Sequence, residues 1–346
     1  MKLWGNSPVF RALVSLGLVG VVTFSLHFLR VPGSSAPDFP CGSPSQTRAN
    51  INIAAGESGS EIAQSLFEAG VVKSSESYFR IAVGDPRSQK VAPGNHEIDL
   101  NLCATEALNQ LLDLSRITGL INIFEGAWLS EILPQFYAAN FSKSDVSSAL
   151  SKVVKPSGFS TIEGLLFPAQ YSFATGTSAK DAMQSMIDRT SKEMKAAGFY
   201  FSKEKFTPQQ FLIIASLVQA EGNTEDFAKI SQVIRNRLVK GMPLQFDSTV
   251  HYVKKTRGSI FLSTQSTLLN SPYNTYRKYG LPPGPINNPG ADALRAAVNP
   301  TPGDWLYFIT VAPFDTRFTS DINQFNDWKV EYKKNLRAGK FRSEKK

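Results

Sequence analysis

The hydrophobic positions of the chain begin with an uncharged, mostly apolar run at residues 12–29. A run of this length is about what one helix needs to cross a bilayer. Lys2 and Arg11 precede it and Arg30 follows it, a bias that favours a cytoplasmic N-terminus and an exported remainder. We therefore expect a single-pass protein of the cell membrane, with a cytoplasmic tail at 1–11 and everything after the transmembrane helix extracytoplasmic. A cleaved signal peptide is the alternative, but no convincing cleavage site lies at the end of the run.

Residues 30–48 are rich in Pro, Gly and Ser, which predicts a flexible linker. A small α+β module is expected at 49–115, where short alternating and amphipathic patterns follow one another. Its predicted elements are a strand around 51–53, a turn followed by a helix within 56–70, a helix over 74–83, a strand at 96–98 and a helix at 105–114.

Residues 116–346 predict a larger, mainly helical domain with short strands, so the fold class is α+β. The expected strands are 117–126 and 306–311, and the expected helices lie before about 155 and at 178–197, 207–221, 225–239, 291–297 and 322–335. Three stretches predict irregular backbone. They are 163–173, the turn-rich 241–252 and the Pro-rich and Gly-rich 271–290.

The helix expected at 207–221 ends on a carboxylate, Glu221. Thr207 suits the N-cap, and Pro208 suits the first helical position because its missing N–H costs nothing there. Glu221 falls on the apolar stripe of the helix, where loss of hydration raises the pKa of a carboxyl and keeps part of it protonated near neutrality. A general acid needs that property. The alternative is an ordinary glutamate that emerges into solvent before Gly222.

The composition excludes some classes of function. The chain has 346 residues, 42% of them hydrophobic, which is ample for ordered domains. Its formal net charge is +8, but the basic residues are scattered apart from the tail 333–346, and no basic stripe interleaved with aromatic residues is present. We therefore expect no nucleic-acid partner. Cys41 and Cys103 have no metal-type spacing, and they form either one disulfide or two unrelated thiols.

Three blocks together carry a resemblance to a known family. They are ASLVQAEG, VIRNRLVKGMPLQFDSTVHY and SPYNTYRKYGLPPGPINNPGADALRAAVNP, in this order. The chain resembles the YceG-like family of endolytic murein transglycosylases, and residues 49–115 resemble a LysM-like domain that binds glycan strands. The resemblance implies a lytic-transglycosylase-like catalytic domain at 116–346, and a spacer role without sugar binding stays open for 49–115.

The resemblance also implies the site residues. Glu221 is the implied catalytic acid/base, while Gln219 stands where the family has a first acidic residue, and Phe325 stands where family members have histidine. Implied substrate-binding residues are Gln245, Asp247, Tyr273 and Asn274. For Tyr273 and Asn274, hydrogen bonds within their loop are the alternative, and for Asp247 a turn or a helix cap. Arg235 and Arg237 either complement the dipole of their helix or meet a carboxylate of the substrate.

The implied reaction cleaves the β-1,4 bond between N-acetylmuramic acid and N-acetylglucosamine without water and leaves a 1,6-anhydro end. No cofactor and no metal ion is implied. The expected partners are peptidoglycan glycan strands, the cytoplasmic membrane and peptidoglycan synthases. Two alternatives remain from other classes. One is a muramidase-type hydrolase, which needs a second carboxylate, and the other is a non-catalytic glycan-binding scaffold.

Overall fold

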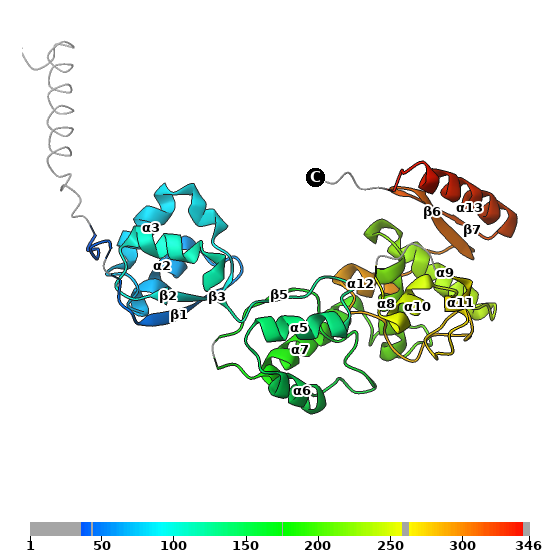
Figure 1. Ribbon diagram of the computed structural model, residues 1–346, viewed down its shortest axis with the longest axis horizontal. Helices are drawn as coiled ribbons and strands as arrows, with labels where there is room; N and C mark the ends of the chain where they lie inside the picture. The colour runs from blue at the N-terminus through cyan, green and yellow to red at the C-terminus, as the bar shows by residue number, and fades with distance from the viewer. Residues whose placement is uncertain (1–35, 43, 175, 258–262, 342–346) are drawn as a thin grey trace, which may run out of the picture. The chain divides into compact units, whose positions relative to one another are not determined.

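The computed structural model describes residues 36–42, 44–174, 176–257 and 263–341. The transmembrane helix expected at 12–29 lies outside these ranges. Within the described ranges, no helix combines the length and the apolar character needed to cross a membrane. The chain divides between Ile117 and Thr118 into two units, whose elements are labelled in Figure 1.

The first unit is a small sheet covered by short helices, in which β1 and β2 are antiparallel. β1 (Arg48–Ile53) pairs with β2 (Gly94–Asp99), and the short β3 (Ile117–Thr118) follows β2 in the sheet order. The helical elements are α2 (Gly59–Glu68), α3 (Ser75–Gly84), η1 (Pro86–Lys90), α4 (Ala104–Leu111) and η2 (Leu114–Arg116). Their apolar faces enclose one core, which includes Leu66, Tyr78 and Leu108.

A disulfide joins Cys41 to Cys103 in this unit. Cys103 is buried at the start of α4, so the bond ties the segment before β1 to the core. The carboxylate of Asp38 reinforces the same junction, since both its oxygens accept from the backbone N–H of Ala104 at 3.2 Å. Of the two alternatives that the sequence left open, the structure shows the disulfide.

The second unit is built mostly of helices. These are α5 (Leu129–Ala138), α6 (Lys143–Lys152), α7 (Ala179–Ala197), α8 (Pro208–Glu221), η3 (Thr224–Asp226), α9 (Phe227–Val239), α10 (Asp247–Lys254), α11 (Thr264–Thr267), α12 (Ala291–Val298) and α13 (Ile322–Arg337). Two short antiparallel pairs accompany them, β4 (Ile121–Asn122) with β5 (Gln170–Tyr171) and β6 (Tyr307–Ala312) with β7 (Asp315–Thr319). The protein is therefore a helix-rich α+β chain with short strands.

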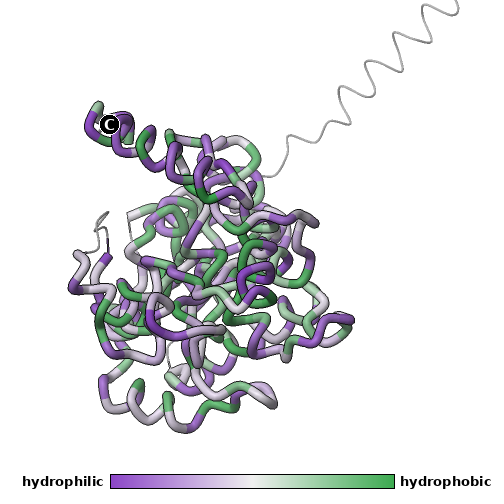
Figure 2. The backbone as a smooth tube through the Cα atoms, turned by 90° about the vertical axis from the view of Figure 1, so that its right-hand side faces the viewer, coloured by the Kyte–Doolittle hydropathy of each residue, from purple (hydrophilic) through white to green (hydrophobic). Residues whose placement is uncertain are grey.

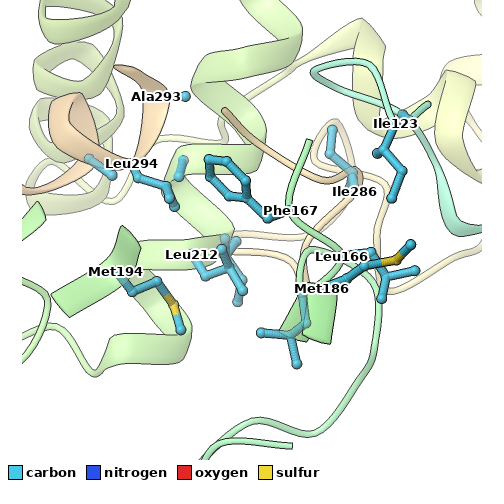
Figure 3. Close-up of a cluster of buried hydrophobic side chains, with 14 of the residues drawn as sticks. Ile123, Leu166, Phe167, Met186, Met194, Leu212, Ile286, Ala293 and Leu294 are labelled. Atoms are coloured by element: carbon cyan, nitrogen blue, oxygen red, sulfur yellow. The ribbon is translucent and has the colours of Figure 1, made fainter. Parts of the chain in front are cut away.

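The core of this unit forms around α8. Helices α9, α10 and α12 pack against it, and segments without regular structure complete the cluster. Figure 3 shows Leu212 of α8 in one cluster with Leu166, Phe167 and Ile286, which come from loops far apart in the sequence. The loops are therefore part of the core, and this explains how irregular backbone can hold side chains in fixed positions.

The C-terminal segment is a hairpin covered by a polar helix. α13 packs on β6, and Figure 2 shows the helix, next to the C label, as largely hydrophilic with hydrophobic residues in between. The side-chain amide of Asn335 donates to the backbone oxygen of Val311 at 2.8 Å, a buried bond that fixes the helix on the strand.

Two sequence predictions of secondary structure were wrong. The strand expected over 117–126 is interrupted after Thr118 by Gly119, whose φ is +58° and whose missing Cβ leaves room for the backbone oxygen of Phe173. The stretch 241–252, expected to be irregular, contains the start of α10. This helix buries Thr249 and Val250 beside α8, a tertiary stabilisation that local sequence does not reveal.

Candidate active site

α8 is buried on nearly every side and ends at Glu221. Thr207 and Gln210 form a capping box at its start, with Pro208 in the first turn as predicted. Every residue from 211 to 218 is buried, so the helix runs through the core and has a wider buried face than the predicted stripe. At its end, a Cβ on Gly222 would lie 2.2 Å from Cδ1 of Ile230, so the glycine lets α9 pack directly against the helix terminus.

The carboxyl of Glu221 is a strongly perturbed acid. Loss of hydration raises its pKa to about 7, and the negative charge of Asp247 contributes to the rise. Ser248, through its side chain and its backbone N–H, and the more distant Arg237 act in the opposite direction. A carboxyl with this pKa is partly protonated at neutral pH, so it can both give and accept a proton.

The N-terminus of α10 lowers the pKa of Glu221 and so opposes the effect of burial. Asp247 and Ser248 form its first turn, where unpaired backbone N–H groups carry partial positive charge and stabilise a nearby carboxylate. The hydroxyl of Tyr276 donates to Oδ1 of Asp247, and burial followed by this bond raises the pKa of Tyr276 above its ordinary range. Tyr276 also lies within electrostatic reach of Glu221. The sequence did not single out this tyrosine.

The two arginines of α9 have different surroundings. Arg235 is paired with Glu204 at 2.8 Å and donates to the backbone oxygen of Ala297, so its role is structural. Arg237 is also buried and donates to the backbone oxygen of Leu306 at 2.7 Å. Unlike Arg235, it interacts with Glu221, and it lies over the ring of Tyr307 at 5.6 Å. Arg237 therefore contributes positive charge near the acid.

The other predicted residues have different surroundings. Gln245 is exposed, with a positive φ of 51°, and its N–H donates to the backbone oxygen of Thr275 at 3.1 Å. Tyr273 is half-buried and packs against Tyr252, with 5.3 Å between ring centroids. Asn274 is fully buried, and its amide donates to the backbone oxygens of Thr267 and Leu269. These two hydrogen bonds of Asn274 lie within its loop, and its contact with the substrate stays a prediction.

A second acid with a raised pKa lies deeper in the unit. Burial raises the pKa of Glu163 to about 7. Its carboxyl accepts from the N–H of Leu129 at 2.9 Å, the amide of Asn288 at 3.1 Å and the hydroxyl of Tyr252 at 3.2 Å. Glu163 is 6% exposed, and it joins three separate segments through these donors.

A cavity of about 220 Å³ adjoins the Glu221 region. It is lined by residues from the segment before α5, the end of α8, α10, the segment after α10 and the Pro-rich loop. They are Glu125, Gly126, Trp128, Gln219, Ala220, Ser248, His251, Thr256, Arg257, Ile286 and Asn287. Ser248 belongs to the cavity wall and also interacts with Glu221, so the cavity and the acid are neighbours. We call this space the α8–α10 cavity.

Comparison with known proteins decides the family. Residues 51–331 match the sequence model of the YceG-like family. The chain belongs to the YceG-like family. It is 31% identical over 317 residues to a protein of Bacillus subtilis named endolytic murein transglycosylase, covering 85% of this chain and 87% of that protein. A Streptococcus pneumoniae protein of the same name is 28% identical over 336 residues, and the match covers 87% of this chain but 59% of the pneumococcal protein.

A solved structure agrees with this family assignment. The crystal structure of a YceG-like protein of Listeria monocytogenes superimposes with a TM-score of 0.53 at 26% identity. The match covers 82% of this chain and 99% of the Listeria chain.

Gln219 and Phe325, the two residues that depart from the family pattern, have different surroundings in the structure. The side-chain oxygen of Gln219 accepts from the N–H of Gly290 at 2.9 Å, so it ties α8 to the Pro-rich loop. The ring of Phe325 stacks on Tyr307 with 5.2 Å between centroids, and Tyr307 in turn lies under Arg237. The ring of Tyr307 therefore contacts both Phe325 and Arg237, the arginine that interacts with Glu221.

Proposed function

We propose that this YceG-like protein is a membrane-anchored endolytic lytic transglycosylase of peptidoglycan that limits the length of nascent glycan strands. One observation carries the proposal. Glu221, whose pKa is raised to about 7, lies at the end of a buried helix in a chain whose relatives are named endolytic murein transglycosylases. The substrate class follows from those relatives, and the chemistry follows from the acid.

In the proposed reaction Glu221 acts twice. Protonated Glu221 donates its proton to the glycosidic oxygen between N-acetylmuramic acid and N-acetylglucosamine as the C1–O bond breaks. The resulting carboxylate then takes the proton of the muramic C6 hydroxyl while that oxygen bonds to C1. The products are a 1,6-anhydro end and a free N-acetylglucosamine hydroxyl, and Glu221 returns to its protonated state without consuming water.

The surroundings of Glu221 suit both steps. Loss of hydration keeps the acid protonated before the first step, and Ser248 at the N-terminus of α10 together with Arg237 stabilises the carboxylate between the steps. One group can therefore serve as acid and base because neither form is strongly disfavoured at neutral pH. Gln245 and Tyr273 remain proposed contacts of the glycan strand.

A muramidase-type hydrolase is the second candidate, because Asp247 lies close enough to Glu221 to raise its pKa. A hydrolase needs such a second carboxylate to act as nucleophile or to activate water. In this chain the Asp247 carboxylate already accepts a hydrogen bond from the hydroxyl of Tyr276, so one of its oxygens is engaged. The lytic reaction, in which Asp247 only tunes Glu221, is therefore the better supported of the two.

The location of the protein is part of the proposal. The Cys41–Cys103 disulfide supports an exported position for the residues that follow the expected anchor at 12–29, since such bonds persist in oxidising compartments. The first unit is proposed to act as a LysM-like module on glycan strands, and peptidoglycan synthases are the proposed protein partners.

Product analysis tests the proposal. Purified peptidoglycan is digested with the protein, and the new glycan ends are identified by mass spectrometry. The proposal predicts 1,6-anhydro ends within strands. New reducing ends instead would identify the hydrolase, and the absence of new ends would identify a non-catalytic scaffold.

A further inference from the structure

The α8–α10 cavity contains an unusual concentration of unpaired polar atoms. Among the described residues, five buried side-chain polar atoms have no hydrogen-bond partner, and three of them belong to residues of the cavity wall. They are Oγ of Ser248, Nε2 of His251 and Oδ1 of Asn287. The Ser248 side chain already acts on the carboxyl of Glu221, which leaves the atoms of His251 and Asn287 without a partner. A buried polar atom without a partner costs about 1 to 3 kcal/mol. Two such atoms in one cavity wall can be satisfied by a ligand that supplies the missing partners.

The hydrogen-bonding character of these atoms is partly fixed by the fold. The side-chain nitrogen of Asn287 donates to the backbone oxygen of Ser216 at 2.8 Å, so its Oδ1 is the atom left to accept. Nε2 of His251 can donate. The wall therefore offers one fixed acceptor and one group able to donate.

Apolar surface lies beside these polar groups. Trp128 is 7% exposed and Ile286 is 1% exposed, and both line the cavity. A ligand that satisfies this wall carries an N–H for Asn287, a carbonyl oxygen for His251, and a small apolar group. An acetamido group has these three parts.

The charges around the cavity favour a neutral ligand. The guanidinium of Arg257 is paired with Glu131, donates to the backbone oxygen of Gly126 at 2.6 Å and lies over Trp128 at 4.1 Å. It is thus already engaged, and Glu125 adds an exposed carboxylate to the same wall. A carboxylate or phosphate ligand would meet no unpaired positive charge among these residues.

We propose that the α8–α10 cavity binds the 2-acetamido group of the sugar that adjoins the bond cleaved at Glu221, with His251 and Asn287 as the specificity-determining residues. The inference rests on the proposed function for its choice of sugar. Ser248, which borders both the cavity and Glu221, sets the two sites side by side. Because the unpaired atoms of His251 and Asn287 are buried, binding of the acetamido group requires the cavity wall to open around them.

The test compares two neutral β-1,4-linked tetrasaccharides that differ at C2, chitotetraose with acetamido groups and cellotetraose with hydroxyls. Binding is measured by titration calorimetry to the full chain carrying Glu221→Gln, so that no cleavage interferes. We expect chitotetraose to bind about tenfold more tightly, the value of one or two buried hydrogen bonds. Adding His251→Phe should remove most of this preference, and adding His251→Gln, which restores an N–H donor, should recover part of it.

A second measurement needs no substitution at the cavity. The chain has three histidines, so the side-chain ¹⁵N signals of His251 can be assigned by comparison with the His251→Gln spectrum. We expect the Nε2 signal to shift with chitotetraose and to stay in place with cellotetraose. Lys254→Gln, on the same helix, serves as the matched control and should leave the preference unchanged.

The possible outcomes separate this inference from the proposed function. Equal binding of the two sugars, or no binding of either, overturns the acetamido assignment even if the wild-type protein forms anhydro ends. Selective binding that His251→Phe leaves intact also overturns it. Selective binding lost in His251→Phe, but without anhydro ends from the wild type, supports the cavity assignment and rejects the transglycosylase reaction.

Discussion

Ser248, in the first turn of α10, interacts with the carboxyl of Glu221, the last residue of α8, through both its backbone N–H and its side chain. The N-terminus of one helix therefore stabilises the charged form of an acid that burial at the end of another helix keeps protonated. Asp247, the residue before Ser248, acts in the opposite direction. Two adjacent residues thus shift the pKa of Glu221 in opposite directions.

This relationship predicts the pH dependence of activity. Glu221 must be protonated at the start of the reaction, so kcat/KM should fall as pH rises through its pKa of about 7. Ser248→Ala removes the hydroxyl that lowers this pKa, while the backbone N–H stays, and should move the falling limb to higher pH, whereas Asp247→Asn should move it to lower pH. The rate of anhydro-end formation between pH 5 and 9 checks both directions. Shifts of the same sign in the two variants would contradict the account.

The same raised pKa predicts that Glu221 destabilises the fold above neutral pH. Between the unfolded value of 4.5 and the folded value of about 7, the folded state binds more protons than the unfolded state. Stability contributed by this group is therefore present at low pH and is lost as pH rises through 7. Glu221→Gln should raise the free energy of unfolding by about 2 to 3 kcal/mol at pH 8.

Urea unfolding at two pH values checks this prediction. The gain from Glu221→Gln should shrink toward zero at pH 5, where the native carboxyl is already protonated. Glu225→Gln, at an exposed position in η3, is the control and should change little at either pH. A gain that is equal at pH 5 and pH 8 would show that the pKa of Glu221 is not raised.

Glu163 is predicted to stabilise the second unit by joining three segments. Glu163→Ala leaves the N–H of Leu129, the amide of Asn288 and the hydroxyl of Tyr252 without their acceptor in a buried site. We expect a loss of about 3 kcal/mol or more in the free energy of unfolding. The measurement is chemical denaturation at pH 7, with Glu225→Ala as the control. A loss below about 1 kcal/mol would mean that water or another group replaces the carboxyl.

Local signals in the sequence predicted the part of the site that local structure determines. Thr207, Pro208 and the apolar run after them predicted α8 with its correct start and end, because capping and helical periodicity act over a few residues. Glu221 could be singled out for the same reason. The burial of the helix on all sides could not, since it depends on which segments return to cover it.

The remaining site residues depend on contacts between distant segments. Thr275 pairs with Thr249 at 3.0 Å between side-chain oxygens and accepts the N–H of Gln245, so the Tyr-Asn loop is fixed by α10 and its preceding turn. These contacts place Tyr276, and not Tyr273, against Asp247. The acid Glu163 was missed as well, because its three donors lie far from it in the sequence.

The central claim is that Glu221 alone supplies the acid and the base. Its most direct test is the rate at which anhydro ends form from peptidoglycan with wild type, Glu221→Gln and Glu163→Gln, each verified as folded by circular dichroism. Both acids have a raised pKa, but only Glu221 lies beside the α8–α10 cavity, while Glu163 is enclosed by its three donors. The account predicts a rate reduced at least about 100-fold in Glu221→Gln and a largely retained rate in Glu163→Gln. Anhydro ends formed by Glu221→Gln at the wild-type rate would contradict it.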